Sequence, residues 1–206
     1  MYLSRTENLP SHVAEGKSGL RAMPLALNLL VVVSVLLNAF LTWRVLDLSK
    51  AVAKLKTEES LAVNAQLPVI DGFDADGQPA RIAFAEGGLP TILYVLRPDC
   101  KWCARNSQNI KALADAAKGK YRIIGISLSS QNLKEYLEQE KLSFPVYTDV
   151  SAETRAALHL GGTPQTIVAS PEGRVLKNWM GAYMGPSQQE VEKFFNFHLP
   201  GLAEQQ

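Results

Sequence analysis

Cys100 and Cys103 are the only cysteines of the chain, and they stand in the run Cys100-Lys101-Trp102-Cys103. Two cysteines at this spacing can cycle between a dithiol and a disulfide, because one thiolate attacks a disulfide and the other resolves the product. An apolar, β-rich run at 91–96 precedes the pair, and a helix-like run at 104–118 follows it. The sequence therefore predicts a reactive cysteine pair at a strand-to-helix junction.

The helix terminus predicts different roles for the two cysteines. Unpaired backbone N–H groups at the first turn favour the thiolate of Cys100, and Lys101 and Arg97 add positive charge that would lower its pKa. Asp99 opposes that shift if its carboxylate points the same way. Cys103 lies one turn further in and is expected to be more buried. We therefore expect Cys100 to attack and Cys103 to resolve, with the Cys100–Cys103 disulfide as the redox centre and no other cofactor.

Other uses of the cysteine pair are less well supported. A structural zinc site needs further ligands, yet the chain has no second cysteine pair, and its three histidines show no ligand spacing with this one. No metal site is therefore expected, although two structural core cysteines remain a possible alternative. The net charge of +1, without a basic run interleaved with aromatic residues, excludes a nucleic-acid partner.

An apolar stretch near the N-terminus predicts a membrane anchor. The chain has 206 residues, enough for one domain plus appendages. Residues 1–22 are polar, and the twenty residues at 24–43 carry no charge. At ~1.5 Å per residue, such a helix crosses the ~30 Å hydrocarbon core of a bilayer. A core helix would show a polar face, and a cleavable signal peptide would have a shorter apolar run. We expect a cytoplasmic segment at 1–23 and a lipid-embedded, single-pass signal anchor at 24–43.

Charge does not decide how this anchor is oriented. Lysine and arginine occur three times before the span (5, 17, 21) and four times soon after it (44, 50, 54, 56), so the positive-inside rule barely discriminates. We place the C-terminal domain in the periplasm, or on the extracytoplasmic face, because dithiols must be actively managed there. The anchor then lies in the inner (cytoplasmic) membrane.

Residues 44–66 are predicted to form a stalk helix and a polar linker. One helix face carries positions 28, 31, 35, 38 and 42 within the span, and the same spacing continues at 41, 45, 48, 52 and 55. Asn and Thr side chains can bond between helices in lipid. Two interpretations stay open: a parallel homodimer through span and stalk, or a lone helix that lies against its own domain.

Residues 67–206 are predicted to form the soluble domain. Two short strands surround the turn Asp76-Gly77, and buried strands are expected at 91–96 and 121–128. Ser130 is expected to cap a helix at 131–141, and Ser187 to Glu190 reads as a capping box for the last helix. The βαβα order, followed by a hairpin at 165–179, predicts an α/β domain: a mixed sheet with helices on both faces.

The stretch from about 65 to 199 resembles the membrane-tethered thioredoxin-like proteins of the TlpA/ResA and cytochrome c maturation type, in the redoxin branch of the thioredoxin superfamily. The resemblance is carried by the strand, C-x-x-C and helix at 92–118, the insert from 124 to 149, the run Gly162-Thr163-Pro164-Gln165-Thr166, and Gly173. It implies a cis Thr163-Pro164 bond opposite the cysteines. Thr163, Pro164 and Trp102 are then candidate substrate-binding residues, because the Thr163 backbone can pair with a substrate strand.

Three positions depart from the pattern of that family. Asp99 stands where the family commonly has Trp, and Trp102 stands where it commonly has Pro. Tyr94 occupies the position of the acidic residue buried beneath the cysteines of ordinary thioredoxin, and a tyrosine cannot replace a carboxylate as proton acceptor. The redox potential therefore cannot be transferred from the resemblance.

The leading functional prediction is an enzyme, a membrane-anchored thiol–disulfide oxidoreductase that acts on protein thiols and disulfides. As a reductase it would need electrons from an integral-membrane thiol partner, and the resemblance implies a role in cytochrome c biogenesis. Three alternatives stay open: a thiol peroxidase, although Arg97 replaces the Thr or Ser of the peroxidase motif; a copper-site assembly factor; and a docking domain without catalysis.

Overall fold

The computed structural model describes residues 25–58 and 61–203. The chain divides into two compact units, and the boundary between them in the sequence falls between Val52 and Ala53. The cytoplasmic segment predicted at 1–23 and the first residue of the predicted span lie outside the described residues.

Over its described part, the N-terminal unit consists of the long helix α1 (Leu25–Glu58), whose residues 53–58 belong to the second unit. Within it, Leu27–Lys50 is long and apolar enough to cross a membrane, and none of its side chains is buried inside the chain. The Asn38 amide donates to the Ser34 carbonyl, and the Thr42 hydroxyl donates to the Asn38 carbonyl, each at 2.8 Å. These two polar groups are thus satisfied within their own helix. The homodimer through span and stalk stays a prediction.

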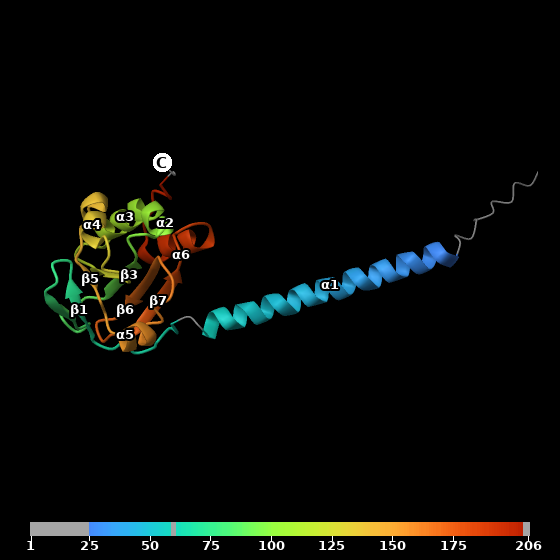
Figure 1. Cartoon of the computed structure of the whole chain (residues 1–206), viewed down its shortest axis with the longest axis horizontal. Helices are drawn as coiled ribbons and strands as arrows, with labels where there is room; N and C mark the ends of the chain where they lie inside the picture. Colours follow the sequence, from blue (N-terminus) through green and yellow to red (C-terminus); the bar gives the residue numbers. More distant parts are fainter. Residues whose placement is uncertain (1–24, 59–60, 204–206) are drawn as a thin grey trace, which may run out of the picture. The chain divides into compact units, whose positions relative to one another are not determined.

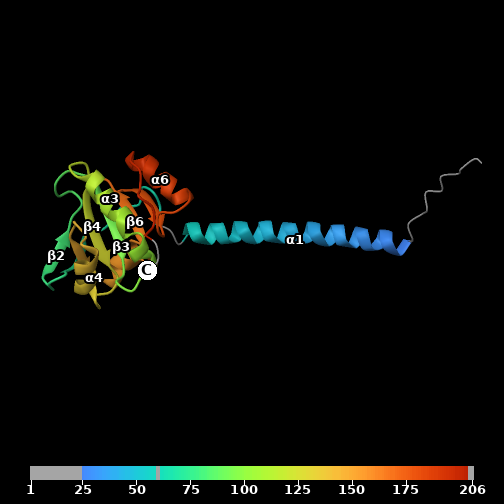
Figure 2. The ribbon, with the colours of Figure 1, turned by 90° about the horizontal axis from the view of Figure 1, so that it is seen from above.

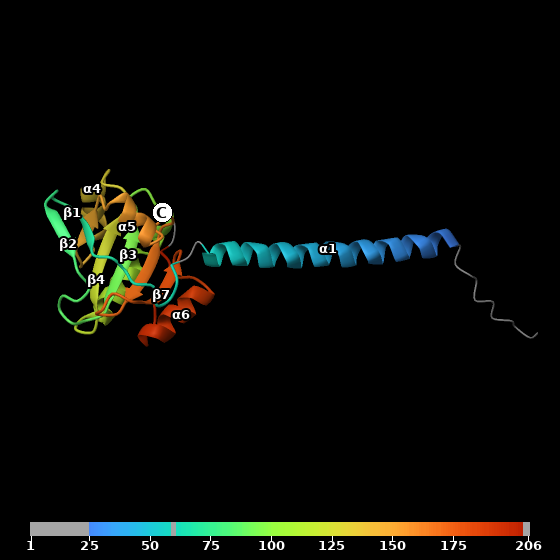
Figure 3. The ribbon, with the colours of Figure 1, turned by 90° about the horizontal axis from the view of Figure 1, so that it is seen from below.

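The C-terminal unit is built on one seven-stranded mixed sheet with the order β2-β1-β5-β4-β3-β6-β7. The central strands β3, β4 and β5 are parallel, and β6 runs antiparallel to β3. A β1–β2 hairpin extends one side of the sheet and a β6–β7 hairpin the other, as Figure 3 shows. The strands are β1 (Ile70–Asp74), β2 (Pro79–Ile82), β3 (Thr91–Leu96), β4 (Arg122–Ser127), β5 (Val146–Thr148), β6 (Gln165–Ala169) and β7 (Val175–Met180).

Helices cover both faces of this sheet. Four of them, with α2 directly continued by α3, lie on one face, and α5 lies on the other (Figures 1 and 2). They are α2 (Lys101–Arg105), α3 (Ser107–Ala117), α4 (Leu133–Glu140), α5 (Ala152–Ala157) and α6 (Pro186–Phe195). The predicted α/β class, the parallel first half and the antiparallel second half are confirmed.

The central strand β3 shows why both faces must be covered. All six of its residues are buried. Successive side chains of a strand point to opposite faces, so Ile92, Tyr94 and Leu96 join the core beneath α2, α3, α4 and α6. Leu93 and Val95 join a second core on the face of α5. The strand that leads into Cys100 is therefore fixed from both sides.

The polar linker predicted up to residue 66 is too long. Leu61 is 4% exposed and packs in the second core. Asn64 and Ala65 exchange backbone hydrogen bonds with Val175 of β7, and Gln66 forms a bridge with Arg174. Residues 61–66 are thus bound to the edge of the sheet. The polar run at 57–60 made the prediction extend too far, since residues 61–66 include Leu61, Ala62, Val63 and Ala65. Backbone groups make most of the contacts between these residues and the sheet.

Two predicted helix caps are wrong. Helix α4 begins after Asn132, which has a left-handed backbone, and Ser130 does not cap it. Helix α6 has Gly185 as its N-cap, because Pro186 takes the first helical position, where its missing N–H costs nothing. Ser187 instead bonds the carbonyls of Ala182 and Met184. The helix predicted at 104–118 is present but divided at Asn106 into α2 and α3.

Candidate active site

Cys100 lies at the N-terminus of α2, as predicted. Its extended backbone makes it the N-cap, and its carbonyl accepts from the N–H groups of Cys103 at 3.0 Å and Ala104 at 3.1 Å. The Cys103 N–H also lies 3.1 Å from Cys100 Sγ, in position to donate to it. A sulfur that receives a backbone N–H at the start of a helix is stabilised as a thiolate. The placement agrees with the expected attacking role of Cys100.

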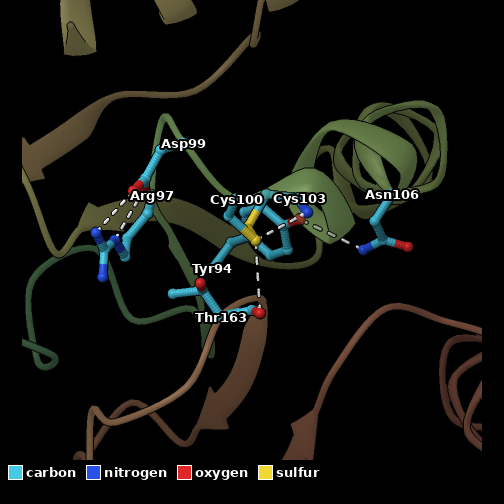
Figure 4. The surroundings of a disulfide bond; sticks show 7 residues. All are labelled: Tyr94, Arg97, Asp99, Cys100, Cys103, Asn106 and Thr163. Atoms are coloured by element: carbon cyan, nitrogen blue, oxygen red, sulfur yellow. Dashed lines mark hydrogen bonds and ion pairs between the residues drawn. A yellow bond between two sulfur atoms is a disulfide. The ribbon is translucent and has the colours of Figure 1, made fainter. Parts of the chain in front are cut away.

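The two cysteines form a disulfide and differ in exposure (Figure 4). Cys103 is 0% exposed and belongs to the core beneath α2 and α3, whereas Cys100 is only partly buried against that core. The outer sulfur is the one that a second protein can reach. This asymmetry is the one expected of an attacking and a resolving cysteine, although the two roles themselves remain predictions.

The Thr163-Pro164 peptide bond is cis, as the resemblance implied. The Thr163 carbonyl oxygen lies 3.5 Å from Cys100 Sγ, close enough to accept from the thiol of the reduced form (Figure 4). Pro164 is buried and leads into β6, and its own carbonyl accepts from the Gly181 N–H at 2.7 Å. Thr163, Pro164 and Cys100 are thus brought together on one surface.

The charged residues before Cys100 interact with each other. The Arg97 guanidinium donates two hydrogen bonds to the Asp99 carboxylate, at 2.9 and 2.8 Å, and Figure 4 shows this pair beside the disulfide. The Asp99 charge therefore offsets the Arg97 charge, which weakens the pKa-lowering effect predicted for Arg97. Lys101 is exposed, and its effect on the Cys100 thiolate stays a prediction.

Side chains of contrasting polarity lie around Cys100. The Trp102 side chain is 45% exposed, with the Arg105 guanidinium 4.7 Å from its ring centre. Met180, also 45% exposed, lies against Gly162 in the loop that leads to Thr163. A cleft of about 370 Å³ opens on the side of α4, and its walls are mainly polar: Arg97, Asp99, Ser129, Gln131, Glu135 and Gln139. A protein partner at Cys100 would thus meet apolar and polar surface.

The structure adds two residues that sequence reasoning missed, Asn106 and Tyr183, both 0% exposed. The side-chain amide nitrogen of Asn106 donates to the Tyr94 hydroxyl beneath the cysteines. The side-chain oxygen of Asn106, Oδ1, accepts from the Tyr183 backbone N–H at 3.0 Å. The Tyr183 hydroxyl in turn bonds the Thr166 hydroxyl on β6. One feature of the sequence could have indicated the role of Asn106: it is a polar residue three positions after Cys103, next to the inward-facing stripe of the helix.

Metal binding finds little support in the described part of the chain, where no three His, Cys, Asp or Glu side chains gather in a way that could hold an ion. The expectation of a site without metal stays a prediction, as does the expectation that no cofactor beyond the disulfide is used.

Known proteins resemble this chain in sequence and in fold. The model of the AhpC/TSA family matches residues 61–178. The fold is similar to the thioredoxin domain of a thiol-disulfide oxidoreductase from Bacteroides vulgatus, with 21% identity, a TM-score of 0.54, and coverage of 66% of this chain and 100% of that one. It is also similar to StoA from Bacillus subtilis, with 20% identity, a TM-score of 0.51, and coverage of 64% and 98%.

A third similar structure is a thiol:disulfide interchange protein from a Bacteroides species, with 22% identity, a TM-score of 0.53, and coverage of 66% and 91%. At these identities the likeness concerns the fold alone, and it confirms the predicted thioredoxin-like architecture. No curated protein sequence matches the chain.

Proposed function

The chain belongs to the AhpC/TSA family of thioredoxin-like redox enzymes, and from this premise we propose that it is a membrane-anchored thiol–disulfide oxidoreductase acting on protein substrates in the periplasm. The observation that carries the proposal is the position of Cys100 Sγ. It lies at a helix N-terminus, 3.5 Å from the carbonyl of Thr163, with Cys103 buried behind it. A substrate can thus reach the Cys100 sulfur and the Thr163 carbonyl, while the buried Cys103 can reach only the mixed disulfide that forms on Cys100.

In the reductive direction, the Cys100 thiolate attacks one sulfur of a substrate disulfide. The other substrate sulfur leaves as a thiolate and takes a proton, and a mixed disulfide joins Cys100 to the substrate. Cys103 then attacks Cys100 Sγ, which releases the second substrate thiol and leaves the Cys100–Cys103 disulfide. Two electrons have moved to the substrate, so an upstream dithiol must return two electrons to the cysteine pair.

We assign that supply to an integral-membrane thiol protein, because a helix long enough to cross the bilayer would keep the domain beside such a donor. The backbone of Thr163 would hold the substrate as an added strand, with Trp102 at its side. The resemblance to cytochrome c maturation proteins makes cytochrome c biogenesis the first process in which to look for the substrate.

Replacing Cys103 by serine is expected to trap the substrate. Cys100 can still attack, but no resolving thiol remains, so a mixed disulfide accumulates on Cys100. It should appear in cells as a high-mass band that dithiothreitol removes, and mass spectrometry would identify the linked protein. The Cys100→Ser variant is the matched control and should give no band. If Cys103→Ser folds normally and accumulates no disulfide-linked partner, the proposal is wrong.

Orientation and direction can be tested together in intact cells. The two cysteines are the only thiols of the chain, so a tagged full-length protein reports on them alone. A reductase in the periplasm should react with a membrane-impermeant maleimide without prior reduction. Labelling that requires permeabilised cells would place the domain on the cytoplasmic side. Labelling that requires a reductant would indicate an oxidase instead.

A further inference from the structure

In the part of the chain that the structure describes, the core beneath the cysteine pair holds neither a carboxylate nor a histidine. Among the described residues, every buried polar side chain is uncharged: Thr91, Asn106, Ser107, Asn109, Ser127, Thr148, Thr154, Gln165 and Thr166. The buried resolving cysteine must nevertheless become a thiolate to act, and a buried charge without a hydrogen-bond donor is costly. This raises the question of which neutral group stabilises the Cys103 thiolate.

Tyr94 is our candidate for this group, because it brings a hydroxyl into the core cluster that contains Cys103. It is 1% exposed, shares the core cluster of Cys103, and lies on β3, the strand that leads into the cysteine pair. Figure 4 shows its ring passing the disulfide, with its hydroxyl facing Asn106. The Asn106 amide nitrogen donates to the Tyr94 oxygen at 3.4 Å.

Asn106 fixes the direction of the Tyr94 hydroxyl hydrogen. The side-chain oxygen of Asn106, Oδ1, accepts from the Asn109 side-chain amide and from the Tyr183 backbone N–H, each at 3.0 Å. Because both of these neighbours are donors, the oxygen of the Asn106 amide faces them and its nitrogen faces Tyr94. The Tyr94 oxygen is then an acceptor toward Asn106, so its O–H hydrogen points elsewhere, and no described residue accepts it while the disulfide is closed.

Burial keeps that hydrogen in place. It raises the pKa of Tyr94 well above its ordinary value, and the titratable groups Tyr183, Tyr136 and Glu140 act in the same direction. Only the hydrogen bond from Asn106 works against them. Tyr94 is therefore a permanent donor and cannot serve as a base.

We propose that the Tyr94 hydroxyl, oriented by Asn106, donates a hydrogen bond to the sulfur of Cys103 when the disulfide opens. The inference rests on the proposed function and assigns a neutral donor to the place of the missing acid. No proton is transferred to Tyr94. In the resolving step the Cys103 thiol gives its proton to water, and its sulfur bonds to Cys100 Sγ as the S–S bond between Cys100 and the substrate breaks. The departing substrate thiolate takes a proton from water.

The test is Tyr94→Phe in the full-length protein. Loss of a donor to a charged sulfur is expected to raise the pKa of Cys103 by ~1 unit. Below that pKa the thiolate fraction falls about tenfold. The less acidic thiolate is more nucleophilic, with a Brønsted slope of ~0.45, so the resolving rate at pH 7 falls only about three- to fourfold. At a pH above the Cys103 pKa values of both the wild type and the variant, Cys103 is a thiolate in each protein. The variant, with the more nucleophilic thiolate, then resolves about threefold faster than the wild type.

Rates are measured by mixing the reduced protein with an excess of a small aromatic disulfide, which separates attack by Cys100 from resolution by Cys103. Tyr183→Phe is the matched control, because it removes another buried hydroxyl, bonded to Thr166, and should leave the pH profile of resolution unchanged. Asn106→Ala should reproduce the Tyr94→Phe profile, and the double variant should show no further shift.

Equal pH profiles of resolution for the wild type and Tyr94→Phe would overturn this inference while leaving the proposed function intact. So would a uniform slowing at every pH, because that indicates general loosening of the core. A wild type that attacks no disulfide at all would instead contradict the proposed function.

Discussion

Replacing Cys100 by serine is expected to lower disulfide exchange by about 10³-fold or more, to the uncatalysed rate. A serine hydroxyl is almost fully protonated at neutral pH and cannot form the mixed disulfide. Serine also keeps the small size of the side chain at the N-cap, a position that favours it. The loss should therefore come from chemistry alone. Dithiothreitol-driven reduction of insulin by the purified full-length protein measures it.

The comparison with Cys103→Ser sharpens this prediction. Cys103→Ser should retain a single stoichiometric attack on a disulfide, whereas Cys100→Ser should show none. Because Cys103 is fully buried, equal first-turnover rates in both single variants would contradict the assignment of Cys100 as the attacking residue. Turnover of hydrogen peroxide that is lost on Cys100→Ser would favour the peroxidase alternative. The structure does not suggest this activity, because the position of the Thr or Ser of the peroxidase motif is held by Arg97, which pairs with Asp99.

The parts of the site that follow from local rules could be predicted from the sequence. A buried strand, an N-terminal helix position for Cys100 and a buried Cys103 all follow from hydrophobic pattern and spacing. The cis bond before Pro164, and its place opposite Cys100, were predicted only through the family resemblance. Spacing in the sequence alone does not bring residue 163 near residue 100. The structure places the two together through the pairing of β3 with β6.

The parts that depend on tertiary contacts could not be predicted. Asn106 looks like an ordinary helical residue, and its role follows from Tyr94 and Tyr183, which are distant in the sequence. The capping box at Ser187 matched a sequence pattern, yet the helix begins two residues earlier, at Pro186 with Gly185 as its N-cap. Leu61 stood in a polar stretch, and only its packing in the second core shows that it belongs to the domain.

Trp179→Ala is expected to destabilise the C-terminal unit by about 3–5 kcal/mol. Trp179 lies on β7, is 5% exposed, and packs against Phe194 and Phe195 of α6 with ring centres 5.4 and 6.0 Å away. Its indole N–H also donates to the Glu190 carboxylate at 3.1 Å. Removing the ring leaves a cavity between the sheet and α6. Urea unfolding of the full chain in detergent, followed by circular dichroism, measures the loss.

Trp102→Ala is the matched control, since it removes the same side chain from the surface. Trp102 is 45% exposed and contacts Arg105, so its loss should cost less than about 1 kcal/mol. If Trp102 binds substrate, its variant should slow exchange with protein disulfides but not with a small aromatic disulfide. Trp179→Ala should instead reduce stability before it affects exchange. Helix α6 supports the loop that carries Tyr183, and the Tyr183 N–H bonds Asn106, which lies at the end of the helix that carries the cysteine pair. A Trp179→Ala protein as stable as the wild type would show that α6 does not hold this side of the active site.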